Sequence, residues 1–262
     1  MMPGRWYCVG LAALAVAALL LAGCVTTGDE QRTRAGASDE EAARINTDLG
    51  IQYMQQERLE MAVERLERAV VQDPRYPRAR VALAMVYEAL GEYDEAEDSF
   101  RRAMRLDRRN AGLLNSYGVF LCRQNRQDEA LQYFERAADD TRYRTPEVAF
   151  TNAGVCLRQV PDLEGAEQWL RRAVQRNPRY PEALLQLAGV TYERDNAMAA
   201  RAFLQRYLEV SEPTPEALWL GVRLETALGD RSAARDHGEK LARDFPDSDQ
   251  AQSWQQGEHD GN

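Results

Sequence analysis

A small residue returns along this chain at a nearly constant interval. Six alanines follow one another at spacings of 34, 34, 36, 34 and 33 residues. A period of this length is typical of a repeat protein, in which each unit buries its apolar face against its neighbours. The chain is therefore expected to stack short units rather than to form one globular core. The six alanines are Ala62, Ala96, Ala130, Ala166, Ala200 and Ala233.

A second small residue precedes each alanine. It lies twelve residues before the alanine in five units, whereas Gly189 lies eleven residues before Ala200, which predicts a turn shortened by one residue. An aromatic residue or leucine follows it three residues later, at helical spacing. The small residues are Gly50, Ala84, Gly118, Gly154, Gly189 and Gly221, and the larger ones are Tyr53, Tyr87, Leu121, Leu157, Tyr192 and Leu224.

This arrangement resembles the tetratricopeptide repeat, a hairpin of two helices packed through small residues. The resemblance implies an all-α fold, a right-handed solenoid of six helix-turn-helix repeats over residues 43–247. Gly91 is expected to end a first helix of one hairpin, because glycine accepts the left-handed conformation of a helix C-terminus. Residues 248–262 are expected to add a short capping helix, with Trp254 packed inward, and a disordered tail from Gly257.

The first residues have the pattern of a bacterial lipoprotein signal peptide. Arg5 precedes an apolar run from Val9 to Ala22, which is shorter than the ~20 residues that span a bilayer. The run ends in Leu-Ala-Gly-Cys, which resembles a lipobox, so residues 1–23 are expected to be removed and Cys24 to be lipidated. Residues 24–42 are rich in small and charged residues and are expected to form a flexible tether. Valine at position 25, where aspartate commonly signals inner-membrane retention, indicates an outer-membrane, periplasm-facing address.

The composition excludes several classes of function. Asp and Glu number 42 against 33 Lys and Arg, a net charge of −9, whereas non-specific nucleic-acid binding needs a basic surface. The chain has two histidines and no phosphate-binding glycine loop, HExxH motif or nucleophile elbow. We expect no enzymatic activity, no cofactor, no metal, no nucleic acid and no small-molecule substrate. One enzyme hypothesis stays open, a substrate cleft in the groove of the array.

The concave face of such an array, formed by the first helix of each hairpin, is the expected partner-binding groove. Ile51, Met54, Val81 and Met85 would form an apolar strip at its N-terminal end, and such strips mark partner sites. The alternative, that these side chains pack between neighbouring helices, stays open. The predicted groove residues are Thr47, Ile51, Met54, Val81, Met85, Glu88, Asn115, Val119, Thr151, Val155 and Arg158.

Two cysteines remain in the repeats, Cys122 and Cys156. Both lie late in the first helices of neighbouring repeats, whose axes are expected ~8–10 Å apart, so the pair can reach the Cα distance of a disulfide. An oxidising periplasm favours the disulfide. The alternative is two buried free thiols.

Four short sequence segments are more specific than the repeat pattern itself. With the lipobox and six repeats, these segments resemble the PilF/PilW family of type IV pilus biogenesis lipoproteins. The resemblance implies a pilotin, anchored in the outer membrane through lipid on Cys24, that binds secretin subunits and promotes their localisation and assembly into a ring. The segments are 115–122 (NSYGVFLC), 133–137 (YFERA), 152–156 (NAGVC) and 177–184 (NPRYPEAL).

A different periplasmic repeat scaffold stays open as the alternative function. Such a lipoprotein would serve outer-membrane protein assembly or regulate a peptidoglycan synthase. The residues alone do not separate it from a pilotin.

Overall fold

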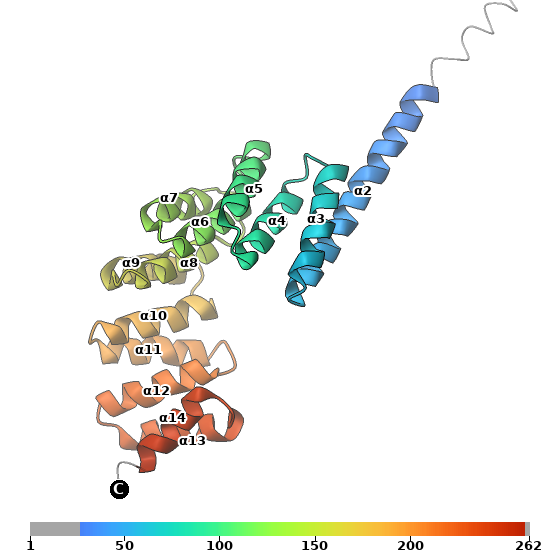
Figure 1. Ribbon diagram of the computed structural model, residues 1–262. Helices are drawn as coiled ribbons and strands as arrows, with labels where there is room; N and C mark the ends of the chain where they lie inside the picture. The colour runs from blue at the N-terminus through green and yellow to red at the C-terminus, as the bar shows by residue number, and fades with distance from the viewer. Residues whose placement is uncertain (1–26, 260–262) are drawn as a thin grey trace, which may run out of the picture. The chain divides into compact units, whose positions relative to one another are not determined.

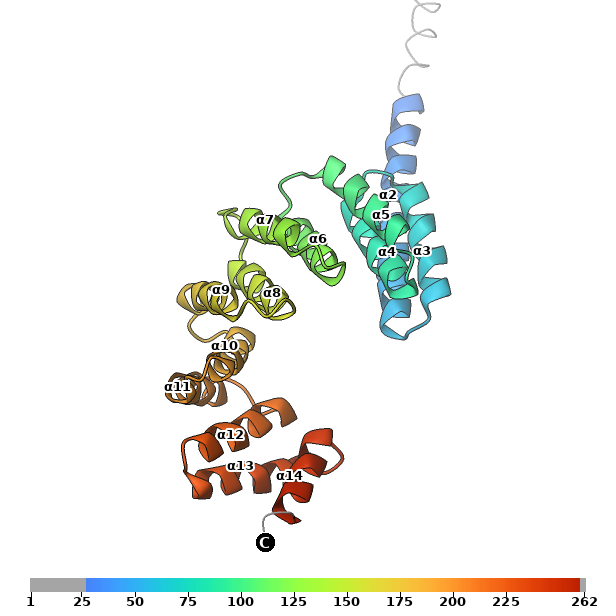
Figure 2. The same cartoon turned by 60° about the vertical axis from the view of Figure 1, so that its left-hand side comes forward.

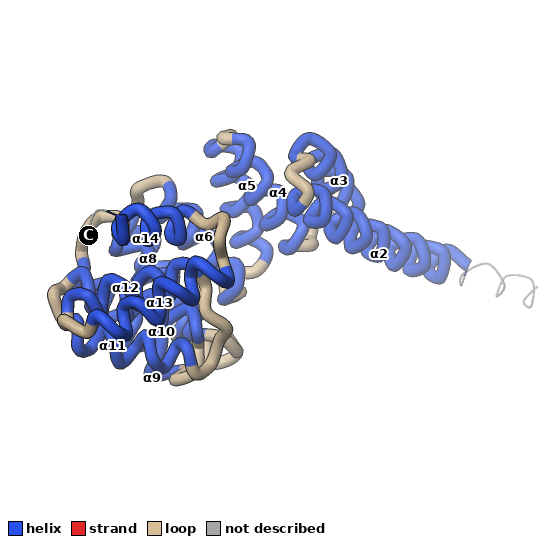
Figure 3. Tube along the Cα trace, turned by 90° about the horizontal axis from the view of Figure 1, so that it is seen from below, coloured by secondary structure: helices blue, strands red, loops and turns tan. Residues whose placement is uncertain are grey.

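The computed structural model describes residues 27–259, with side chains from residue 38 to residue 257. Every regular element in that range is an α-helix, as the tube in Figure 3 shows. The helices form two compact units, one ending at Leu106 and the other beginning at Asp107. The all-α expectation is confirmed, and the residues between 27 and 259 contain no helix long and apolar enough to cross a membrane.

The first unit contains two helical hairpins (Figure 1). α2 pairs with α3, and α4 pairs with α5. The N-terminal part of α2 extends beyond α3 and is free of the other helices of its unit in both ribbon views (Figures 1 and 2). The bounds are α2 Thr27–Gln55, α3 Leu59–Gln72, α4 Pro77–Leu90 and α5 Tyr93–Leu106.

The second unit contains four further hairpins and a terminal helix, which follow one another in chain order (Figure 2). The hairpins pair α6 with α7, α8 with α9, α10 with α11 and α12 with α13, and α14 packs on α12 and α13 as the expected cap. The bounds are α6 Ala111–Arg123, α7 Gln127–Ala138, α8 Pro146–Arg158, α9 Leu163–Arg176, α10 Pro181–Glu193, α11 Ala197–Leu208, α12 Pro215–Ala227, α13 Arg231–Asp244 and α14 Asp249–His259.

The recurring small residues lie where the two helices of a hairpin meet. A Cβ added to Gly118 would come 2.8 Å from the ring of Phe134, so only a residue without a side chain fits. Gly154 faces Leu170 with the same sixteen-residue separation, and a Cβ there would lie 2.6 Å from that side chain. The repeat period therefore arises because small residues are needed wherever the two helices of a hairpin pack closely. Five of the recurring alanines, Ala62, Ala96, Ala130, Ala166 and Ala200, are completely buried.

The turns inside the hairpins also repeat. Gly91 ends α4 with φ of 79°, as expected, and Gly229 takes φ of 80° at the equivalent turn of the last hairpin. Asn125 and Asp195 hold the same left-handed conformation, with φ of 57° and 59°. Asparagine and aspartate adopt this conformation more readily than other residues with a side chain, so the turn is kept without glycine.

The expected register of the fifth repeat is wrong by one residue. Ala188 is completely buried and lies sixteen residues before Leu204, the separation that joins Gly118 to Phe134. Gly189 faces the guanidinium of Arg158 instead, at 3.7 Å from a Cβ built there. The small residue of this repeat is therefore Ala188, twelve residues before Ala200, and its turn has lost nothing.

Two terminal segments differ from expectation. Residues 27–42, expected to be a flexible tether, belong to α2, and residues 257–259, expected to be disordered, belong to α14. Trp254 is half-buried and packs against Leu218, Leu241 and Ala251, as expected for a capping helix. The signal peptide, Cys24 and residues 260–262 lie outside the described residues.

Candidate functional site

The predicted apolar strip lies on α2 and α4 of the first unit. Ile51 and Met54 are half-buried and pack against the core around Leu66 and Val86. Val81 is half-buried, whereas Met85 is 41% exposed. Both interpretations of the strip therefore hold in part: its base seals the helix packing, and Met85 presents apolar surface to solvent. Glu88 follows on the same helix and is half-buried.

Two predicted groove residues cannot touch a partner. Thr47 is completely buried, and its hydroxyl donates a hydrogen bond to the carbonyl of Ala43 at 2.7 Å. Thr151 is 2% exposed, and its hydroxyl donates to the carbonyl of Glu147 at 2.7 Å. Both hydroxyls satisfy themselves on the preceding turn of their own helix, which lets threonine replace a small apolar residue in the packing.

The inner helices of the second unit are tied together by polar side chains. The side-chain amide of Asn152 in α8 donates to Asn115 Oδ1 in α6 at 3.0 Å. Val119 of α6 and Val155 of α8 are half-buried. Of the predicted groove residues in this unit, Asn115, Val119, Val155 and Arg158 keep part of their surface in solvent.

Arg158 is the centre of a hydrogen-bonded network. Its guanidinium donates to Gln186 Oε1 at 2.6 Å and to Glu193 Oε1 at 2.5 Å, both on α10. The Gln186 amide in turn donates to Glu182 Oε1 at 2.9 Å. Arg158 thus links α8 to two side chains of α10. Its partly exposed positive charge is hydrogen-bonded by Gln186 and Glu193.

This network forms one wall of a hollow of about 670 Å³ between α10 and α12. The opposite wall carries Trp219, Leu220 and Arg223 of α12. The Arg223 guanidinium lies 4.7 Å from the ring centroid of Tyr192, a cation–π distance. The lining of the hollow combines apolar side chains such as Leu185 and Trp219 with charged ones such as Glu193.

Of the residues that line this hollow, the sequence predicted only Arg158, because the predicted groove residues end with the fourth repeat. In the first four repeats, the predicted groove residues lie three positions before, one after or four after the small residue. From Ala188, that rule selects Leu185, Gly189 and Tyr192, and all three line the hollow. Counted from Gly189 instead, the same spacing selects Gln186, Val190 and Glu193, of which Gln186 and Glu193 line the hollow, so extending the spacing to the fifth repeat indicates the hollow in either register.

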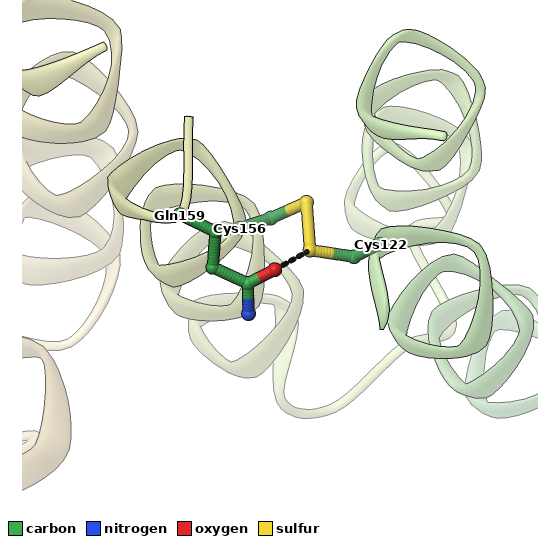
Figure 4. Close-up of a disulfide and its surroundings, with 3 residues drawn as sticks. All are labelled: Cys122, Cys156 and Gln159. Carbon is green, nitrogen blue, oxygen red and sulfur yellow. Dashed lines mark hydrogen bonds between the residues drawn. A yellow bond between two sulfur atoms is a disulfide. The ribbon is translucent and has the colours of Figure 1, made fainter. Parts of the chain in front are cut away.

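Cys122 of α6 and Cys156 of α8 form a disulfide in the structure, with Cα atoms 5.8 Å apart (Figure 4). The side-chain amide oxygen of Gln159 points to the Cys122 sulfur at 3.4 Å. A disulfide sulfur carries no proton, so this approach is a polar contact and becomes a hydrogen bond only in the thiol form. The third and fourth repeats are joined covalently through their inner helices.

The described side chains contain no group of three or more His, Cys, Asp or Glu residues placed to hold a metal ion. At the hollow beside Trp219, the Arg158 guanidinium donates hydrogen bonds to Gln186 and Glu193, and Arg223 lies over an aromatic ring.

Comparison with known proteins agrees with the repeat architecture. The sequence profile of the tetratricopeptide repeat matches residues 47–111 and 89–145. The type IV pilus assembly protein PilF of Pseudomonas aeruginosa is 32% identical over 235 residues, which cover 90% of this chain and 93% of that protein. The chain belongs to the PilF/PilW family.

Solved structures of PilF/PilW proteins superpose on this chain. The crystal structure of PilW, described as a widely conserved type IV pilus biogenesis factor, matches with a TM-score of 0.71 and 31% identity over 80% of this chain and 97% of PilW. The structure of Pseudomonas aeruginosa PilF matches with a TM-score of 0.69 and 30% identity over 84% of this chain and 99% of that one. The expectation that the chain is not an enzyme agrees with its membership of this family of pilus assembly factors.

Proposed function

We propose that this PilF/PilW-family protein is the pilotin of a type IV pilus system, a lipoprotein that binds secretin subunits and brings them to the outer membrane for assembly. The observation that carries the proposal is the 32% identity to a type IV pilus assembly protein over 90% of the chain. Because that similarity spans the whole repeat array, it supports a shared role for the array rather than a shared repeat alone.

The address on the membrane would be supplied by lipid on Cys24. Acyl chains contribute ~0.8 kcal/mol for each buried methylene, and several chains on one cysteine anchor a protein stably. Cys24 lies three residues before α2, so the anchor would be attached almost directly to a helix that runs into the first repeat. Anchoring raises the local concentration of a bound secretin subunit at the membrane where it must assemble.

Partner binding would use the inner faces of the first helices. The strip around Met85 offers apolar surface in the first unit. The hollow beside Trp219 offers apolar side chains combined with charged ones in the second unit. Aromatic and arginine side chains contribute most to binding energy at protein interfaces, which favours Trp219 and Arg223 as contact residues.

The proposal is tested in a strain that lacks the gene and is complemented with the wild-type chain or with Cys24→Ser behind a cleavable secretory signal peptide. We expect heat-resistant secretin multimers in the outer-membrane fraction, and twitching, only with the wild-type chain. The unlipidated variant should still bind secretin in the periplasm and fail to deliver it. Expression of each chain is checked on the same fractions.

The same strain separates the pilotin from the alternative scaffold. A regulator of outer-membrane protein assembly or of a peptidoglycan synthase would leave secretin multimers unchanged while it altered porin levels or cell shape. Normal secretin multimers in the deletion strain would refute the pilotin proposal.

A further inference from the structure

An arginine-rich hollow of about 780 Å³ lies in the second unit, away from the inner-face cleft. It is formed by the linker before α6, by α7 and by the linker between α7 and α8. Four arginines line it, Arg108, Arg109, Arg136 and Arg142, against two carboxylates, Asp139 and Asp140. A basic hollow is unexpected on a chain whose net charge is −9.

Three of these arginines have no carboxylate partner. Among the described residues, Arg108, Arg109 and Arg136 form no ion pair, although Arg136 stacks 5.1 Å from the ring centroid of Tyr133. All three are exposed. The nearby arginines on α5 behave differently, because Arg101 pairs with Glu97 and Arg102 pairs with Asp98 in the manner of an ordinary solvated helix face.

The two acids at the hollow do not neutralise these arginines. Both oxygens of Asp140 accept hydrogen bonds from the Arg142 guanidinium, at 3.0 and 2.7 Å. The fork of Arg142 holds the pKa of Asp140 at about 2, and Arg109 adds a further lowering effect. Asp140 is therefore charged and already engaged by Arg142, which leaves Asp139 as the other carboxylate of the hollow beside three arginines that form no salt bridge.

The hollow depends on an insertion that the repeat does not need. The linker between α7 and α8 covers residues 139–145, whereas the linkers before α4, α6 and α10 cover 73–76, 107–110 and 177–180. The same insertion appears in the sequence as the spacing of 36 between Ala130 and Ala166. This longer linker carries Asp140 and Arg142, and the backbone N–H and guanidinium of Arg142 donate hydrogen bonds to the Asp140 carboxylate.

We propose that this hollow binds an acidic segment of a partner protein, a stretch of chain rich in glutamate or aspartate. Planar guanidinium groups bind carboxylates through paired hydrogen bonds, and three that form no salt bridge can engage successive acidic side chains of an extended segment. The attraction acts within a Debye length of about 8 Å, so the patch dominates over the negative charge of the rest of the chain. This binding is independent of the pilotin role.

A lipid phosphate is the competing anion, and the surface argues against a membrane. Peripheral membrane sites combine basic residues with apolar side chains that enter the bilayer. The apolar residue of the hollow, Leu114, is 3% exposed, and none of the large exposed apolar side chains of the described residues lines it. A protein segment suits this surface better than a bilayer.

The test uses fluorescence anisotropy with a labelled peptide in which glutamate alternates with glycine, and with its glutamine counterpart. We expect the wild-type protein to bind only the glutamate peptide, more weakly as salt rises. The variant Arg108→Gln/Arg109→Gln/Arg136→Gln should weaken binding by about tenfold or more. The control Arg68→Gln/Arg101→Gln/Arg102→Gln removes the same charge from paired arginines and should change binding less than about twofold.

Several results would overturn the proposal. They are an absence of binding of the glutamate peptide, equal binding of the glutamine peptide, or equal losses in both triple variants. Flotation with phosphatidylglycerol vesicles tests the membrane directly. Vesicle binding that is lost in the first triple variant, without peptide binding, would assign the hollow to lipid. Circular dichroism and melting curves confirm that each variant is folded, so an altered fold cannot imitate either result.

Discussion

The sulfur atoms of Cys122 and Cys156 are bonded between the inner helices of two successive repeats. Repeat arrays are held together only by contacts between neighbours, so each interface can open by itself. The disulfide makes the interface between the third and fourth repeats an exception. Unfolding that begins at either end of the second unit would meet a covalent link there.

Replacing both cysteines, Cys122→Ser/Cys156→Ser, should lower the free energy of unfolding by about 3–4 kcal/mol, because the link closes a loop of 34 residues in the unfolded chain. Urea unfolding followed by circular dichroism measures the change. Reductant should produce the same loss in the wild-type protein and none in the double variant. Two free thiols in the denatured, unreduced protein would contradict the link.

Gly118 and Gly189 should respond in opposite directions to alanine. Gly118→Ala places a Cβ 2.8 Å from the Phe134 ring and should destabilise the protein by about 1–3 kcal/mol. Gly189→Ala meets nothing closer than 3.7 Å and should stabilise α10 by about 0.5–1 kcal/mol, because alanine favours helix. Thermal unfolding of the two variants checks the signs. A stabilised Gly118→Ala variant would show that the close packing is mistaken.

His237 should make the last repeat sensitive to acid. It occupies the position held by Leu66, Phe134 and Leu170 in other repeats, against Gly221, and burial lowers the pKa of His237 below 6.5. The folded state therefore favours the neutral ring. Its contribution is complete above pH ~6.5 and is lost as the pH falls through the lowered pKa.

The free energy of unfolding should decline for this reason between neutral and mildly acidic pH. His237→Leu, which restores the leucine of other repeats, should flatten this part of the pH profile. A profile that is unchanged by the substitution would place the titrating group elsewhere.

Met85 should matter for partner binding, and Met198 should not. Both are exposed methionines, at 41% and 64%, but Met85 lies on the inner-face strip and Met198 on α11, the second helix of its hairpin. Met85→Asp should lower capture of secretin from detergent-solubilised membranes by about tenfold, because it removes apolar contact and buries a charge. Met198→Asp is the matched control. Equal capture by both variants would remove the strip from the binding site.

The repeat architecture could be predicted from the sequence because it depends on residues that cannot vary freely. Positions such as Ala130 and Gly154 accept almost no side chain, so the close approach of two helices remains visible as a period. The disulfide partners were predictable because helical register and repeat length place both cysteines on adjacent inner helices.

The exposed surface was less predictable because a change of one residue in register moves a side chain to another face. Thr47 and Thr151 fit the groove pattern, yet both are buried. Each hydroxyl donates a hydrogen bond to a carbonyl of its own helix, so it needs no solvent. Ala188 and Gly189 are two small residues in succession, which leaves the helical register of the fifth repeat undecided from the sequence. Residues 27–42 have the composition of a linker and are helical in the structure, where α2 continues into the first hairpin.

That continuity of α2 sets a geometric condition on anything this protein carries. The sixteen residues of α2 that precede the first repeat, 27–42, span about 24 Å at 1.5 Å per residue. Under the proposed lipid anchor on Cys24, a rigid segment of that length would limit how far the first hairpin can move from the bilayer surface. A bound partner would then be presented within a limited distance of the membrane.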